Sequence, residues 1–138
     1  MRIKIFTLIT CVLFCFSNAQ EKKLDCSKFK TGKFEMQNDE TGLYFIITRT
    51  ATAQVEETFS LETGEKVLPD NHFLIQWEND CEYILLLDKE KHKSDEWDEY
   101  VDSNGGLKNK IIETNESCSI VETTFEDLTI QSEICKTE

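Results

Sequence analysis

The sequence predicts an all-β domain, an antiparallel meander that forms an open barrel or a two-layer sandwich and is stapled by disulfides. The part that follows a predicted signal peptide contains twelve threonines, nine isoleucines and four valines but only two alanines. This balance disfavours helices, because β-branched side chains lose rotamer freedom against a helical turn and pack well on a pleated surface. Apolar and polar residues alternate over short stretches, as in a meander. Four cysteines in a short exported chain indicate two disulfides.

The first nineteen residues have the pattern of a secretory signal peptide. Arg2 and Lys4 provide the positive start, an apolar run follows, and Ser17-Asn18-Ala19 supplies the small residues of a cleavage site. The apolar run is too short to remain as a transmembrane helix. We therefore expect a signal peptide over 1–19 and a single secreted β domain over 20–138, located in the periplasm or outside the cell.

Period-two patterns predict nine strands in the mature chain. They lie near Lys28–Met36, Leu43–Thr50, Gln54–Ser60, Lys66–Leu68, His72–Glu78, Cys81–Leu87, Leu107–Thr114, Cys118–Phe125 and Leu128–Lys136. Turn residues such as Glu40-Thr41-Gly42 and Ser103-Asn104-Gly105-Gly106 separate them. The longest connection covers 88–106, where Trp97 and Tyr100 are spaced for one face of a short helix or for a flap packed on the sheet.

The central hairpin has apolar residues on both faces. If Asn79-Asp80 is a two-residue loop, Ile75 opposes Ile84 and Trp77 opposes Glu82. One face then carries Phe73, Ile75, Trp77, Ile84 and Leu86, and the other carries Leu74, Tyr83, Leu85 and Leu87. Two alternatives explain the second face. The segment 88–106 covers it, or it is a surface for a partner, a ligand or a second copy of the chain. In the second case it is the predicted binding surface.

The last hairpin predicts a cross-strand disulfide. With Glu126-Asp127 as the loop, Phe125 opposes Leu128 and Cys118 lies directly across from Cys135, in a non-hydrogen-bonded pair that a disulfide can bridge. A longer loop with a shifted register is the alternative, because Glu-Asp is not a preferred tight-turn dipeptide.

Two stretches resemble a group of small, uncharacterised exported proteins of flavobacterial type. They are the opening C-x-x-F-K-T-G-x-F from Cys26 to Phe34 and the later W-x-x-D-C-x-Y-x-L from Trp77 to Leu85. Members of the group are sometimes labelled as a DNA topoisomerase subunit, which we take as an inherited error. The resemblance implies that Cys26 pairs with Cys81, which leaves Cys118 for Cys135. It implies no activity.

The sequence predicts no catalytic residue, metal ligand or cofactor. His72 lies at the start of an apolar strand and His92 in a charged run, where solvated or hydrogen-bonded histidines are common, and the four thiols are expected to be oxidised. The acidic loop Asp95–Asp102 offers oxygen ligands but lacks the spacing of an EF-hand loop, so calcium binding stays open.

The charge of the chain argues against nucleic-acid binding. The formal net charge is −12, and removal of Arg2 and Lys4 leaves 13 bases against 27 acids, or −14. Such a chain repels phosphate backbones, and no glycine-rich phosphate loop is present. The predicted function is an exported, non-enzymatic binding or interaction domain, whose partner is a protein or a small apolar ligand. One alternative is a secreted hydrolase inhibitor, which needs a protruding loop such as 88–106. The other is a lipocalin-like carrier of a small apolar molecule, which needs an open interior, whereas Phe73, Trp77 and Phe125 are large enough to fill it.

Overall fold

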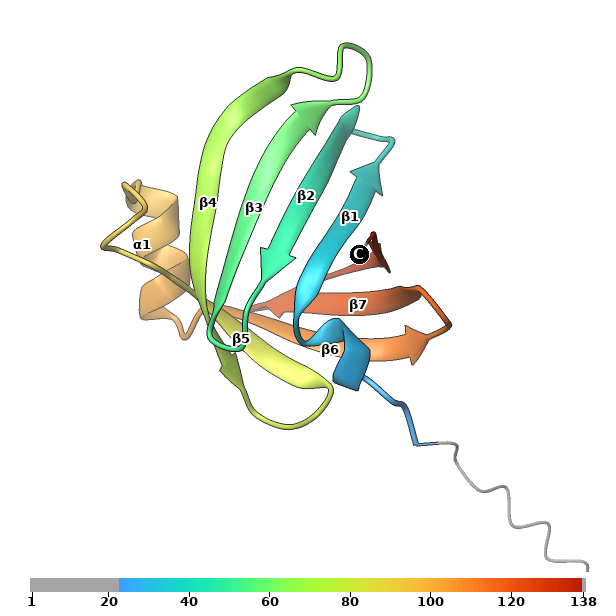
Figure 1. Cartoon of the computed structure of the whole chain (residues 1–138). Helices are drawn as coiled ribbons and strands as arrows, with labels where there is room; N and C mark the ends of the chain where they lie inside the picture. The colour runs from blue at the N-terminus through green and yellow to red at the C-terminus, as the bar shows by residue number, and fades with distance from the viewer. Residues whose placement is uncertain (1–22, 138) are drawn as a thin grey trace, which may run out of the picture.

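A computed structural model describes residues 23–137, so the predicted signal peptide over 1–19 lies outside the described residues. The fold is an antiparallel meander of eight strands that closes into a barrel, because the first strand also pairs with the last (Figure 1). The strands are β1 (Gly32–Asn38), β2 (Leu43–Arg49), β3 (Ala53–Ser60), β4 (Lys66–Trp77), β5 (Glu82–Leu87), β6 (Leu107–Thr114), β7 (Cys118–Phe125) and β8 (Leu128–Lys136). The predicted all-β class is confirmed, and the architecture is a barrel. No helix among residues 23–137 has the length and apolar character needed to cross a membrane.

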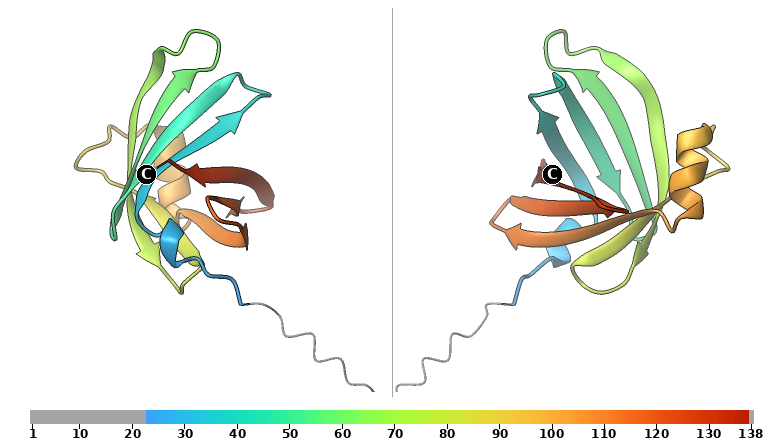
Figure 2. Two further views of the ribbon diagram at one scale, coloured as in Figure 1. Left: turned by 45° about the vertical axis from the view of Figure 1, so that its right-hand side comes forward. Right: turned by 180° about the vertical axis from the view of Figure 1, so that it is seen from behind.

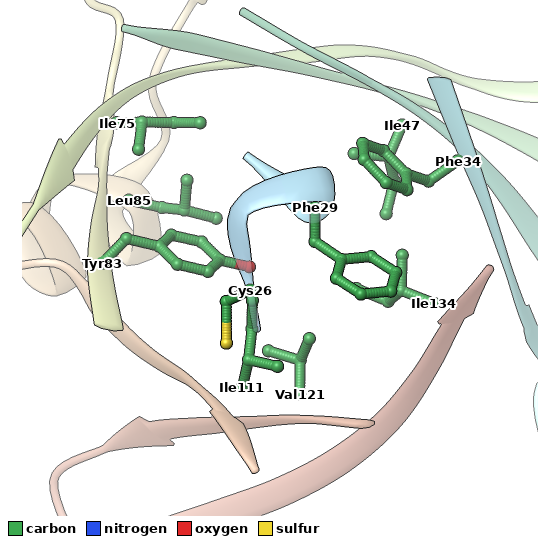
Figure 3. Packing of buried hydrophobic residues seen from close by; sticks show 10 residues of the cluster. All are labelled: Cys26, Phe29, Phe34, Ile47, Ile75, Tyr83, Leu85, Ile111, Val121 and Ile134. Carbon is green, nitrogen blue, oxygen red and sulfur yellow. The ribbon is translucent and has the colours of Figure 1, made fainter. Parts of the chain in front are cut away.

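The chain enters the barrel through a short helix rather than a strand. Ser27–Phe29 forms the 3-10 helix η1, so the strand predicted from Lys28 begins only at Gly32. Phe29 is fully buried at the centre of the core, and the core side chains come from η1 and from strands on all sides of it (Figure 3). The members of this cluster are Cys26, Phe29, Phe34, Ile47, Ile75, Tyr83, Leu85, Ile111, Val121 and Ile134. The 3-10 helix therefore plugs one end of the barrel.

Strand β4 joins two segments that the sequence analysis separates. Lys66–Leu68 and His72–Glu78 were predicted as two strands, but the pairing with β3 continues through Pro69. Glu56 opposes Asn71 and Thr58 opposes Leu68, so two residues of β4 face one residue of β3. Such a bulge accommodates a proline, which has no N–H to donate to the ladder.

The predicted register of the β4–β5 hairpin is wrong by one residue. Trp77 pairs with Tyr83 and Ile75 with Leu85, because the turn contains three residues instead of two. Asn79 shapes this turn, since its Oδ1 accepts the N–H groups of Cys81 and Glu82. A one-residue slip moves every side chain of the strand to the other face.

The predicted binding surface is therefore not one surface. Tyr83, Leu85 and Leu87 point into the barrel and are 2 to 8% exposed, whereas Leu74 lies on the outside and is 46% exposed. The barrel interior contains residues from both of the predicted faces of this hairpin, and this explains why both predicted faces are apolar.

The predicted register of the β7–β8 hairpin is confirmed. Phe125 pairs with Leu128 and Cys118 with Cys135, whose Cα atoms are 4.0 Å apart and whose sulfurs are bonded. Glu126 takes a φ of 50° in the tight turn. The second disulfide joins Cys26 to Cys81 and ties η1 to the β4–β5 turn, as the resemblance implies.

The long connection contains the helix α1 (Glu96–Ser103), which lies beside β4 on the side away from β1 (Figures 1 and 2). Its start is a capping box, in which Asp95 Oδ1 accepts the N–H of Asp98 and Asp98 Oδ2 accepts the N–H of Asp95. The segment folds back on the barrel, but its aromatic residues contact Phe125 of β7 with centroid distances of 5.7 Å for Trp97 and 5.8 Å for Tyr100. The outer face around Leu74 is not covered by these two rings.

Gly106, which leads from α1 into β6, lies against the outer side of β5. Its φ is +79°, and a Cβ atom there would lie 2.5 Å from the carbonyl oxygen of Leu85. We expect Gly106→Ala to lower the free energy of unfolding by about 2–3 kcal/mol, through left-handed strain and overpacking. Gly105→Ala is the matched control, because Gly105 also has a positive φ but open space around its Cα. Urea denaturation of both variants tests this, and equal losses would contradict the role of the close contact.

Candidate functional site

The barrel interior contains a cavity of about 110 Å³ whose wall is unusually polar. Apolar side chains of several strands line it, among them Met36, Ile47 and Leu85. Its polar lining residues are Arg49, Gln54, Glu56, Tyr83, Asn109, Thr123 and Ser132. Buried polar groups are costly unless they are hydrogen-bonded, so a polar wall inside a small barrel needs an explanation.

Four of these residues form one hydrogen-bonded chain. Arg49 at the end of β2 donates from Nε to Gln54 Oε1 at 2.6 Å and from Nη2 to the Tyr83 hydroxyl at 2.6 Å. Its Nη1 donates to the carbonyl of Phe29 at 3.0 Å, which fixes the η1 plug. Gln54 Nε2 then donates to Glu56 Oε1 at 2.6 Å. We call Arg49, Gln54, Glu56 and Tyr83 the interior network.

Arg49 is 3% exposed, so its guanidinium lies within the barrel. Among residues 23–137 no carboxylate oxygen lies within 4.0 Å of its guanidinium. The guanidinium carbon lies 5.3 Å from the Phe34 ring centroid and 4.8 Å from that of Tyr83. Three hydrogen bonds and two aromatic faces thus take the place of a carboxylate partner.

Burial raises the pKa of the Glu56 carboxyl above its ordinary value, while the Gln54 hydrogen bond and the Arg49 charge lower it by less. Burial also raises the pKa of the Tyr83 hydroxyl, against the smaller effect of the Arg49 charge. The ionised form of Glu56 is therefore disfavoured in the folded chain. Glu56 is half-buried on the inner face of β3, and a carboxylate whose ionised form is disfavoured at such a position is a candidate for a functional role.

The raised pKa predicts the pH dependence of stability. A carboxyl that binds its proton more tightly in the folded state supports folding at low pH, and this contribution is lost as the pH rises through the raised pKa. Glu56→Gln cannot ionise, so the stability of the variant relative to wild type should increase as the pH rises from about 4, the ordinary pKa of a glutamic acid, through the raised pKa of Glu56. Urea denaturation across this range measures the effect. Glu57→Gln is the control, because Glu57 lies on the outer face beside Lys66, and the same trend in that variant would contradict the assignment.

A second cavity of about 330 Å³ lies between α1 and residues of β3, β4, β5 and the start of β6. Glu56, Leu85 and Leu107 line both cavities, so the two spaces adjoin at these residues. The remaining walls come from β4, β5 and α1, namely Asn71, Phe73, Leu87, Trp97, Asp98, Val101 and Asp102. We call this space the mouth cavity. Its volume lies in the range of small-molecule sites.

The seam between β1 and β8 gives the interior another route to solvent. Only Phe34 and Glu35 of β1 pair with β8. Further along β8, Ile130 lines the interior cavity and is 53% exposed. Hydrogen bonds between β1 and β8 close the barrel near Phe34 and Glu35, and the seam is open to solvent near Ile130.

The histidines and the acidic loop that the sequence analysis considers do not form one common site. His92 Nε2 lies 3.2 Å from Asp98 Oδ2, and His72 lies in β4. Of the acidic loop 95–102, Asp95 and Asp98 cap α1, and Asp102 Oδ1 accepts the N–H of Leu87 at 3.0 Å. Among residues 23–137, the one set of three potential metal ligands within reach of each other is Cys118, Glu133 and Cys135, two of which are the bridged sulfurs.

The sequence analysis missed the interior network. Arg49 lies at the same parity of β2 as the buried Ile47, and Gln54 and Glu56 share one face of β3. Arg49 at an inward position of the largely apolar strand β2 is the available signal, whereas the inward positions of β3 are all polar and do not stand out. No family model, curated protein or solved structure matches the chain, so the site is argued from its own geometry.

Proposed function

We propose that the chain is an exported, non-enzymatic binding domain that holds a small, partly apolar molecule in the mouth cavity and the adjoining interior. The observation that carries this proposal is the pairing of an apolar cavity with a preorganised polar floor. Leu85, Leu107 and Phe73 provide apolar area, and the interior network provides fixed hydrogen-bonding groups beneath them. Such a combination is typical of small-molecule sites.

The three large aromatic residues Phe73, Trp77 and Phe125, which the sequence analysis places against a lipocalin-like carrier, do not fill the two cavities. Trp77 packs on Tyr83 near the plugged end, with ring centroids 4.7 Å apart, and Phe125 contacts α1. Phe73 is the one of the three that lines the mouth cavity.

The hydrolase-inhibitor alternative is less well supported. It needs a rigid loop that protrudes, whereas the segment 88–106 packs its helix on Phe125 and bonds Asp102 to the Leu87 backbone. A carrier of small molecules uses the same segment as a cover for the barrel mouth.

Fluorescence titration with the neutral apolar probe N-phenyl-1-naphthylamine tests the proposal on the secreted chain. We expect saturable binding of one probe per chain. Leu107→Trp should abolish it, because Leu107 lines both cavities. Leu74→Trp, on the exposed outer face, should leave it unchanged. Probe binding that is equal in all three proteins, or absent from wild type, would contradict the proposal.

A further inference from the structure

The mouth cavity has an unbalanced set of ionisable side chains. Its ten lining residues include the carboxylates Glu56, Asp98 and Asp102, and no lysine, arginine or histidine. The other lining residues are Asn71 and six apolar or aromatic side chains. The cavity is therefore an apolar space with negative charge in its wall.

Two of the three carboxylates are compensated by groups of the protein itself. Asp98 Oδ2 accepts the N–H of Asp95 and lies 3.2 Å from His92 Nε2. Asp102 Oδ1 accepts the Leu87 N–H, and its Oδ2 lies 3.3 Å from Lys89 Nζ. Both oxygens of Asp102 have partners, and Asp98 has an imidazole nitrogen beside its Oδ2, although its Oδ1 accepts no hydrogen bond from residues 23–137.

Glu56 differs from both. Within residues 23–137 its only donor is Gln54 Nε2, which takes Oε1, and no basic nitrogen lies within 4.0 Å of the carboxylate. Arg49 cannot serve it directly, because Gln54 lies between them and the three guanidinium nitrogens donate elsewhere. Glu56 thus keeps an acceptor oxygen where the mouth cavity meets the interior.

An aromatic residue lies at the outer end of the same cavity. Trp97 of α1 lines it and is 60% exposed, and Phe73 lines it from β4. Indole and phenyl faces attract cations, and they also bind the carbon atoms of an organic ligand.

We propose that the ligand of the mouth cavity is an organic cation, an amine or quaternary ammonium compound with an apolar body, whose positive group lies against Glu56. The inference rests on the proposed function and specifies its ligand class. Trp97 and Phe73 contact the apolar body and the periphery of the cationic group. The ligand supplies the direct ion pair that no basic group among residues 23–137 makes with Glu56, and this accounts for a carboxylate kept where burial disfavours its ionised form.

Three probes with the same phenyl body and different charge test the inference. They are 2-phenylethylamine as the cation, 2-phenylethanol as the neutral compound and 3-phenylpropionate as the anion, each titrated by calorimetry into wild type. We expect the amine to bind most tightly. Glu56→Gln should weaken the amine by about tenfold to a hundredfold, as expected for loss of a charge-assisted hydrogen bond, and should leave the alcohol unchanged.

Two further variants provide the controls. Glu57→Gln removes the neighbouring carboxylate from the outer face and should leave amine affinity as in wild type. Trp97→Leu replaces an exposed ring of α1 and should weaken the amine more than the alcohol. It keeps the inference testable should Glu56→Gln fail to fold.

The outcomes separate this inference from the proposed function. Binding of the alcohol or the propionate as tightly as the amine, or an amine affinity that is unchanged in both Glu56→Gln and Trp97→Leu, would overturn the cation assignment while naphthylamine binding preserves the function. If 2-phenylethylamine does not bind but N-phenyl-1-naphthylamine does, the cation assignment is wrong and the proposed function stands. If neither the amine nor the naphthylamine probe binds, both proposals are wrong.

Discussion

Replacing Cys26 and Cys81 together by alanine is expected to lower the free energy of unfolding by about 4 kcal/mol, the loop-closure entropy that a cross-link between residues 55 apart removes from the unfolded chain. The loss should exceed the simple estimate, because Cys26 is 1% exposed at the centre of the core and the bridge holds η1 against the β4–β5 turn. A small domain has about 5–15 kcal/mol of stability in total, so the variant should be close to unfolding at 37 °C.

The second disulfide provides the matched comparison. Cys118 and Cys135 are 17 residues apart in a hairpin that its own ladder already defines, so their replacement by alanine should cost about 3 kcal/mol. Urea denaturation of the two double variants, with amide exchange at Phe29 as a local probe of η1, measures both effects. A larger loss from the hairpin bridge would show that native packing around the sulfurs, rather than chain entropy, sets the order.

The two hairpins show which parts of the fold the sequence could specify. In the β7–β8 hairpin, the loop length, the apolar alternation and the position of Cys118 across from Cys135 all agreed on one register. In the β4–β5 hairpin both faces were apolar, so the alternation could not detect a slip of one residue. The Asn79 side chain, which bonds two backbone N–H groups of the turn, favoured the three-residue loop, and this effect has no signature in hydrophobic period.

The helix and the site differ in how far the sequence predicts them. A short helix is one of the two alternatives for Trp97 and Tyr100, whereas the interior network is not predicted. The capping pair Asp95 and Asp98 marks a helix start, but it lies within an acidic run whose carboxylates also suit a calcium loop. The interior network depends on closure of the barrel, because Arg49 meets Tyr83 and Phe29 only after strands distant in sequence come together. Residues that pair across 20 to 34 positions leave no pattern along a single strand.

Substituting Arg49 by methionine is the second change with a large expected effect, about 3–5 kcal/mol of lost stability. Methionine preserves a long apolar stem between the Phe34 and Tyr83 rings, but it leaves the Phe29 carbonyl, Gln54 Oε1 and the Tyr83 hydroxyl without their donor. Glu56 also loses the Arg49 charge that lowers its pKa, so its pKa should rise further. Arg49→Lys should recover part of the loss, because an ammonium restores the charge but cannot supply three donors in a planar fork.

A double-mutant cycle with Tyr83→Phe separates the network from simple packing. Tyr83→Phe removes the hydroxyl that Arg49→Met leaves unpaired, so the double variant should lose less stability than the two single variants together, with an interaction energy of about 1–2 kcal/mol. Tyr44→Phe is the control. Tyr44 stacks on Phe59 with ring centroids 5.0 Å apart and is not part of the interior network, so its loss of stability should add to that of Arg49→Met. Strict additivity with Tyr83→Phe, or a loss below about 1 kcal/mol for Arg49→Met itself, would mean that water replaces the guanidinium donors. In that case the interior of the barrel is wet at its plugged end, and the polar floor assigned to the ligand site is not preorganised by Arg49.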